Sequence, residues 1–135
     1  MIYLAFETFV YDELSAGNHT ITLTVEDEVG GICSDTLLLA VGTPPTLTLS
    51  SPTDGEVYST GDIISFEAIV TDQEDIPSDI SLSWNSDIDG EFSTQSADSY
   101  GNISFPKSNL SAGVHGVTIT ATDSTGLTSS TSLSI

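Results

Sequence analysis

One segment of the chain occurs twice, and this repetition limits the folds that the sequence can adopt. Residues 14–30 read LSAGNHTITLTVEDEVG, and residues 110–126 read LSAGVHGVTITATDSTG, at an offset of 96 residues. Nine of the seventeen positions are identical, and Ile21 is replaced conservatively by Val117. Self-similarity at a fixed period is typical of repeated structural units, so we expect both segments to form the same part of one unit.

The offset also predicts the domain boundaries. Residues 44–135 hold one complete repeat, whereas residues 1–43 match only the second half of one, for which we expect three strands. Between them lies the sequence VGTPPT at 41–46, whose two prolines fix the backbone and cannot join a central strand. We therefore expect a chain that belongs to a tandem array.

The repeated segment has the alternation of a β-strand. Ile21, Leu23 and Val25 alternate with threonines, and the pattern returns at 116–121. A period of two with β-branched residues indicates a half-buried strand. Short strands separated by turn residues predict an all-β sandwich, and about 96 residues is the size of one immunoglobulin-like β-sandwich. We expect further strands at residues 46–50, 63–71, 80–85, 99–105 and 127–135.

The charge balance excludes several classes of partner. The chain has 20 acidic residues and one basic residue, Lys107, which gives a formal net charge of −19. Binding to the phosphate backbone of nucleic acids or to anionic membrane surfaces requires several cations. No apolar run has the length of a membrane span, so direct membrane insertion is not expected. Cys33 is the single cysteine, so no intrachain disulfide can form.

Four stretches together resemble a known family. SWNSDIDG at 83–90, LSAGVH at 110–115, VTITATDSTG at 117–126 and VTDQED at 70–75 are similar to the PKD-type and related immunoglobulin-like repeats of prokaryotic surface proteins. The resemblance covers the complete repeat, and residues 9–43 as a tail. It implies an extracellular, cell-surface module without enzymatic activity, of the kind found in spacers, adhesin stalks and appendages of enzymes.

We expect the core of the complete repeat to contain one large aromatic residue. Alternation places Trp84 on the same apolar face as Ile80 and Leu82, and the resemblance implies that it is the core tryptophan of the third strand, C, of the sandwich and packs against strands B and F. The alternative for Trp84 is a platform on which a carbohydrate stacks. Alternation also places Phe66, Ile64, Val117 and Ile119 in the core.

His19 and His115 hold the same position in the repeat, two residues after a Ser-Ala-Gly turn. We expect each ring to tie its turn to nearby backbone, as a polar ring commonly does at such a corner. A zinc site is the alternative, but it needs three or four converging ligands, and Cys33 has no partner motif.

Carboxylates close in sequence raise the alternative of glycoside hydrolysis. Asp87, Asp89 and Glu91 are such a group, but Asp89 and the glycine after it are typical of a turn. No G-x-S-x-G nucleophile motif is present. We therefore expect no catalytic residues.

Calcium is the metal that the acidic loops would take. Hard cations bind several oxygen ligands, and two loops that meet at one end of a sandwich carry Asp72, Glu74, Asp75 and Asp123. The turn before the first repeated strand adds Asp12 and Glu13, which we expect at the same junction. The alternative is a solvated acidic surface. No other cofactor is expected.

Three asparagines lie in N-x-Ser/Thr sequons, which are acceptors for glycans in extracellular proteins: Asn18, Asn102 and Asn109. These observations lead to a non-enzymatic structural or adhesive module of a surface protein, filament or stalk, stiffened by calcium if the cation binds. Its partners would be neighbouring repeats of the same or another chain, in a homo-oligomer or filament. The alternatives are a glycan- or protein-binding module that uses Tyr58, Phe92 or Tyr100, and an accessory domain of a secreted hydrolase.

Overall fold

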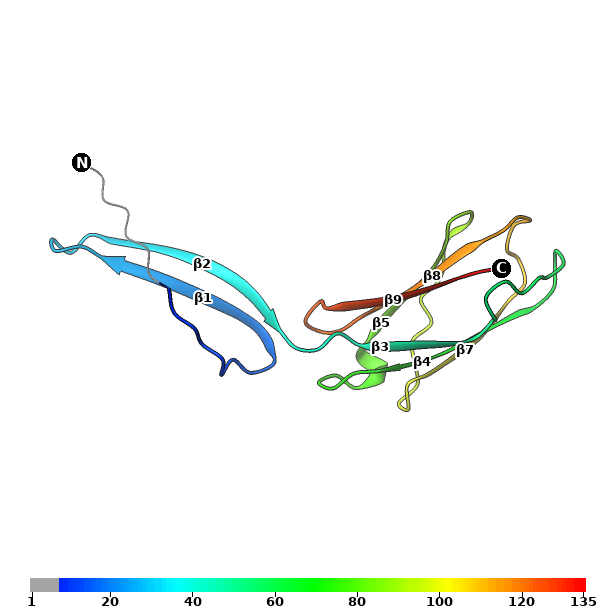
Figure 1. The fold of residues 1–135 in the computed structure, drawn as a ribbon, viewed down its shortest axis with the longest axis horizontal. Helices are drawn as coiled ribbons and strands as arrows, with labels where there is room; N and C mark the ends of the chain where they lie inside the picture. The colour runs from blue at the N-terminus through cyan, green and yellow to red at the C-terminus, as the bar shows by residue number, and fades with distance from the viewer. Residues whose placement is uncertain (1–7) are drawn as a thin grey trace. The chain divides into compact units, whose positions relative to one another are not determined.

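A computed structural model describes residues 8–135. They form antiparallel β-sheets and a single turn of 3-10 helix, and they divide into two units between Val41 and Gly42 (Figure 1). The all-β class expected from the alternating strands is confirmed. The boundary between the units lies at the start of the proline-containing segment 41–46.

The first unit is a β-hairpin. Strand β1 (Gly17–Glu26) pairs along its whole length with β2 (Ile32–Val41), and the turn between them is closed by Asp27, whose carboxylate accepts the backbone N–H groups of Val29 and Gly31 at 3.0 and 2.7 Å. Residues 8–41 therefore hold two of the three strands that were expected, because residues 8–16 form no strand. Residues 1–7 lie outside the described part of the chain.

The second unit consists of two antiparallel sheets (Figure 1). One sheet has the order β3-β4-β7 and the other β6-β5-β8-β9, and a 3-10 turn, η1, connects β4 to β5. The bounds are β3 Thr46–Ser51, β4 Ile64–Thr71, η1 Pro77–Asp79, β5 Ser81–Ser86, β6 Gly90–Ser93, β7 Asn102–Lys107, β8 Gly116–Thr122 and β9 Thr128–Ser134. The inward side chains of both sheets form one hydrophobic core, which is compatible with a β-sandwich.

Aromatic rings fill the centre of this core. Trp84 on β5 meets Phe66 on β4 and Phe105 on β7 edge to face, with ring centroids 5.5 and 5.0 Å apart. Such pairs each contribute about 0.5–1.5 kcal/mol beyond the area that they bury. The residues expected in the core, namely Trp84, Phe66, Ile64, Val117 and Ile119, all have exposed fractions of 6% or less.

The chain enters and leaves the second unit at opposite ends. At the entry, the Thr43 hydroxyl donates to a Glu74 carboxylate oxygen at 2.7 Å, in the β4–β5 loop. That loop is hydrogen-bonded to the loop that follows β8. At the exit, Ile135 exchanges two backbone hydrogen bonds, of 2.8 and 3.1 Å, with His115, which precedes β8. The length of β8 therefore separates the two points.

Candidate functional site

Both histidines tie their turns to the backbone, as the sequence predicts. The Nε2 atom of His115 lies 2.7 Å from the carbonyl oxygen of Ser111, and Nε2 of His19 lies 2.7 Å from that of Ser15, in each case four residues earlier. The two corners therefore share one geometry at the offset of 96 residues.

The His115 corner contains a serine that the sequence analysis did not single out. The Oγ atom of Ser86 lies 2.7 Å from Nδ1 of His115 and accepts the backbone N–H groups of Ile88 and Asp89 at 3.1 and 3.3 Å. Because both N–H groups donate to Oγ, its own proton goes to Nδ1, and the ring donates from Nε2 to the backbone. Ser86 and His115 are buried, and their hydrogen bond joins β5 to the turn before β8.

The clustered carboxylates near the same corner accept hydrogen bonds from the protein. Asp87 accepts the N–H of Gly116, and Asp89 accepts that of Ser111, both at 2.8 Å. Hydrogen bonds from the hydroxyl and backbone N–H of Ser111 lower the pKa of Asp89 below its ordinary value. Glu91 accepts the hydroxyl of Ser83 at 2.7 Å. Asp87 and Asp89 thus hold the corner in place, whereas Glu91 links β6 to β5.

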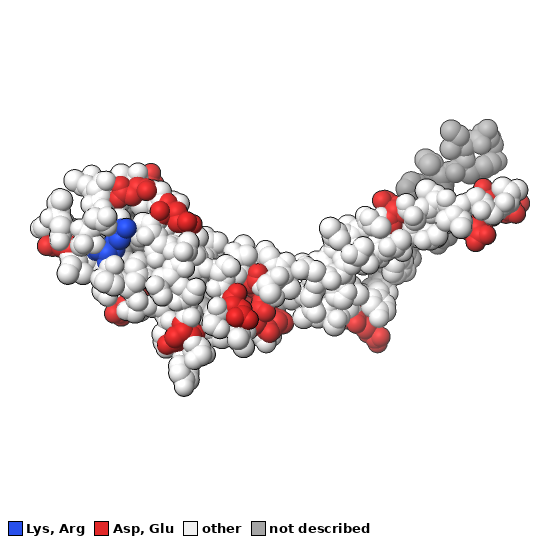
Figure 2. Space-filling view, turned by 180° about the vertical axis from the view of Figure 1, so that it is seen from behind, with Lys and Arg blue, Asp and Glu red and all other residues white. Residues whose placement is uncertain are grey.

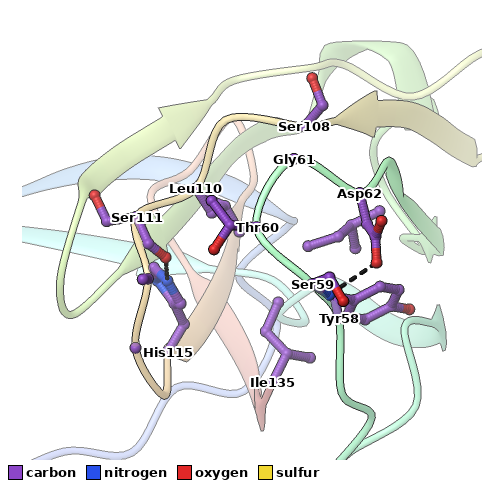
Figure 3. A pocket seen from close by; sticks show the side chains of 13 residues that line it. Tyr58, Ser59, Thr60, Gly61, Asp62, Ser108, Leu110, Ser111, His115 and Ile135 are labelled. Atoms are coloured by element: carbon purple, nitrogen blue, oxygen red, sulfur yellow. Dashed lines mark hydrogen bonds between the residues drawn. The ribbon is translucent and has the colours of Figure 1, made fainter.

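A pocket of about 210 Å³ lies beside this corner (Figure 3). Three segments far apart in the sequence form it: residues 58–64 before and at the start of β4, residues 108–115 between β7 and β8, and Ile135. Asp62 is the one acidic residue among those that line the pocket, and its carboxylate accepts the backbone N–H of Ser59 at 2.8 Å. Burial and the nearby Glu56 raise the pKa of Tyr58, so the phenol is neutral. Hydroxyls beside an aromatic ring suit a small polar ligand such as a sugar.

The other aromatic candidates lie elsewhere. Phe92 packs on the core, with its ring centroid 5.2 Å from that of Phe66 and the ammonium of Lys107 5.7 Å from its own centroid. Tyr100 is 83% exposed and does not line the pocket. Among the three candidates, Tyr58 alone combines an aromatic ring with a cavity.

The acidic loops meet at the opposite end of the second unit. Both carboxylate oxygens of Asp75 accept hydrogen bonds from Ser124, one from its N–H at 2.8 Å and one from its hydroxyl at 2.9 Å. Oδ1 of Asp72 accepts the N–H groups of Glu74 and Asp75 at 2.8 and 2.9 Å. The β4–β5 and β8–β9 loops are therefore joined directly by protein hydrogen bonds.

Asp123 begins the β8–β9 turn and is buried. Its Oδ1 accepts the N–H and hydroxyl of Thr125 and the N–H of Leu127, each at 2.8 Å. Burial pushes the pKa of Asp123 upward, but these hydrogen bonds together outweigh it and leave the pKa below its ordinary value. The carboxylate is thus kept ionised by the turn itself.

The loop acids do not converge as calcium ligands do. Among residues 8–135, no group of three or more His, Cys, Asp or Glu side chains is arranged to hold a metal ion. The oxygens of Asp72, Glu74, Asp75 and Asp123 described above accept hydrogen bonds from the protein, while Asp12 and Glu13 belong to the first unit. Calcium binding stays a prediction. Figure 2 shows the acidic side chains of the face in view as separate patches.

The hairpin of the first unit carries an apolar face that nothing in residues 8–135 buries. Leu23, Val25 and Leu37 are 57–64% exposed and lie on the same side as Ile21 and Leu39. The opposite side carries four threonines and one serine, together with the exposed Leu38 and Ile32. An isolated two-stranded hairpin is marginally stable at best in water, so this face is a candidate interaction surface.

The three sequon asparagines, Asn18, Asn102 and Asn109, are exposed. The side-chain amide of Asn102 donates to the carboxylate of Asp98 at 3.1 Å, and the backbone N–H of Asn102 donates to it at 2.9 Å. These bonds lower the pKa of Asp98. A glycan on Asn102 would compete with the side-chain bond.

Comparison with known proteins gives no identification. No protein-family model matches the chain, and neither the curated proteins nor the solved structures contain a match. Within the described residues, no helix has the length and apolar character needed to cross a membrane.

Proposed function

We propose that the chain is a non-enzymatic structural or adhesive repeat module of an extracellular surface protein, filament or stalk. In this proposal the second unit is one immunoglobulin-like sandwich of the PKD type, and the first unit is the last hairpin of another. The partners are neighbouring repeats, and the module acts by holding more distal domains at a distance.

One observation carries the proposal: the hairpin β1–β2 has the same pairing register as β8–β9, at the offset of 96 residues. Ile21 pairs with Leu37 as Val117 pairs with Leu133, and the other pairs of the shorter hairpin follow the same shift. The turns agree as well. Asp27 accepts two N–H groups of its turn as Asp123 does, and the turn glycines have φ angles of 83° and 91°.

The path of the chain supports an end-to-end array. Because the second unit is entered at the loop end near Thr43 and left at the corner near Ile135, modules joined in series would follow one another along the strand direction. Glu74 accepts a hydrogen bond from Thr43, so the segment that joins the two units is fixed to the second unit.

A force measurement tests the mechanical part of the proposal. Repeats of residues 42–135 linked in series should each unfold in one cooperative step when they are stretched. The 94 residues of Gly42–Ile135 set the gain in contour length at roughly 310–340 Å, less the folded length of the unit. Extension without discrete steps would contradict the proposal.

Antibodies raised against residues 42–135 test the location. They should label intact source cells, and labelling that requires permeabilised cells would contradict an extracellular module.

The pocket beside Tyr58 supports a second candidate function, glycan binding. Thr60 lines this pocket and is exposed, so Thr60→Trp should fill it without disturbing the core. Thr94→Trp, at an exposed position outside the pocket, is the matched control. A glycan-array signal that Thr60→Trp removes and Thr94→Trp retains favours this function, whereas no signal with the unchanged chain argues against it.

A further inference from the structure

The second unit shows what covers a hairpin of this kind. The apolar residues of β8 and β9 that correspond to the exposed face of β1–β2 are Val117, Ile119, Ala121 and Leu133, and all four are buried. They pack against the inner face of the β3-β4-β7 sheet, while β8 pairs with β5 along its other edge. In the described part of the first unit, β1 pairs with β2 alone.

We propose that the apolar face of β1–β2 and the free edge of β1 form a docking surface for the β3–β7 half of a repeat of this same kind. The inference rests on the proposed function, and it adds the partner of the hairpin and the contacts that the partner makes.

The register in the second unit specifies the strand that pairs with β1. Trp84 lies opposite Ile119 and Ser86 opposite Val117. At the offset of 96 residues, the docked strand runs antiparallel to β1, with a large apolar residue opposite Leu23 and a hydroxyl residue opposite Ile21.

His19 is a second observation that indicates such a strand. Its Nε2 atom already bonds to the Ser15 carbonyl, and its Nδ1 atom makes no hydrogen bond to any residue between 8 and 135. In the second unit, Nδ1 of His115 is satisfied by the hydroxyl of Ser86 on β5. The docked strand therefore supplies the hydroxyl that completes the His19 corner.

Charge argues against a second copy of the hairpin as the occupant. Asp35 lies directly opposite Leu23 on the apolar face, so two hairpins face to face would bury two carboxylates between them. In the second unit the corresponding residue is Thr131, which is half-buried.

Cys33 provides the readout. It lies opposite Val25 near the turn and is exposed. Its counterpart in the second unit is Ser129, whose Oγ is buried and makes no hydrogen bond to a described residue. A thiol at this position would be covered by the docked half without losing a hydrogen bond, so its labelling rate reports docking.

The experiment places residues 44–109 directly before residue 14, so that the chain runs 44–109 and then 14–135. Labelling of Cys33 by a thiol reagent should be at least ~10-fold slower in this fusion than in the 135-residue chain, since reaction then requires local opening. Leu23→Asp in the fusion puts a charge on the docked face and should restore the fast rate.

A second fusion is needed because two apolar residues of the hairpin are larger than their counterparts in the second unit. Val25 corresponds to the smaller Ala121 and Ile21 to Val117, so the hairpin brings extra methyl groups into the interface. A fusion with Val25→Ala and Ile21→Val removes them. If Cys33 reacts rapidly in both fusions, the proposal is overturned, while the stepwise unfolding of residues 42–135 is unaffected.

A second copy as the occupant has its own signature. Slow labelling of Cys33 in the 135-residue chain, with a dimeric mass that Leu23→Asp reduces to that of the monomer, would show that hairpins cover one another. That result would also overturn the proposal.

Discussion

Replacement of Ser86 by alanine tests whether the buried corner holds the second unit together. The Oγ atom donates to Nδ1 of His115 at 2.7 Å and accepts two backbone N–H groups at 3.1 and 3.3 Å. Alanine leaves the ring nitrogen unpaired in a site where Ser86 is 1% exposed and His115 3%. An unsatisfied buried polar group costs about 1–3 kcal/mol, so with the weaker loop bonds we expect a loss of about 2–4 kcal/mol.

The loss should be visible in thermal and urea unfolding. For a domain of this size, 1 kcal/mol changes Tm by about 4–8 °C, so Tm should fall by roughly 10–30 °C. Trp84 is the single tryptophan and lies in the core, so its fluorescence reports the second unit alone. Ser130→Ala is the matched control, because that hydroxyl bonds to Thr120 at 3.0 Å on the surface. If Ser86→Ala unfolds within 3 °C of Ser130→Ala, the reasoning is refuted.

Three further predictions concern the loops. Gly101→Ala should cost about 1–3 kcal/mol more than Gly126→Ala. Both glycines have φ near 90°, but a Cβ at Gly101 presses on the Val70 carbonyl oxygen, whereas Gly126 has open space; equal urea midpoints would contradict this. Asp123→Asn should be less stable than the unchanged chain at pH 7. Because the folded pKa of Asp123 is lowered, its stabilisation is present above its ordinary pKa of about 3.9 and is lost as the pH falls through the lower folded value. The two acid-unfolding curves should therefore converge below that value, and a constant gap would show another cause. Millimolar calcium tests the predicted cation site: a bound cation should raise Tm and EDTA should reverse the rise, whereas a Tm that calcium leaves unchanged would contradict the site.

The sequence predicts the strands in which apolar residues alternate regularly and misses the shortest strand, β6. The alternation of apolar residues in 63–71 and 116–121 places β4 and β8 and their buried faces correctly. Strand β6 has four residues and a register shift against β5, so no period can be read from it. The third strand expected in the first unit is absent from residues 8–41: its counterpart in the second unit, β7, pairs with β4, and no strand in the described part of the first unit corresponds to β4.

The candidate site could be predicted only in part. Repetition of His19 and His115 indicated both corners, and loop order indicated that Asp75 and the β8–β9 loop would meet. The role of Ser86 could have been found, because a serine two residues after Trp84 must point inward. The pocket could not have been predicted from the sequence, since it is formed by segments about 50 residues apart in the chain.

The direction of the terminal strands determines how the second unit would resist a pull. β3 and β9 contact each other, and both begin at the loop end and run toward the exit corner, so they are parallel although they belong to different sheets. A load applied through Thr43 and Ile135 therefore acts along both strands. It shears the hydrogen bonds of β3 to β4 and of β9 to β8, which lie perpendicular to the strands, so that many must break together rather than one after another. Because forced unfolding is governed by the unfolding rate, this direction of loading favours a long-lived module even at ordinary thermodynamic stability.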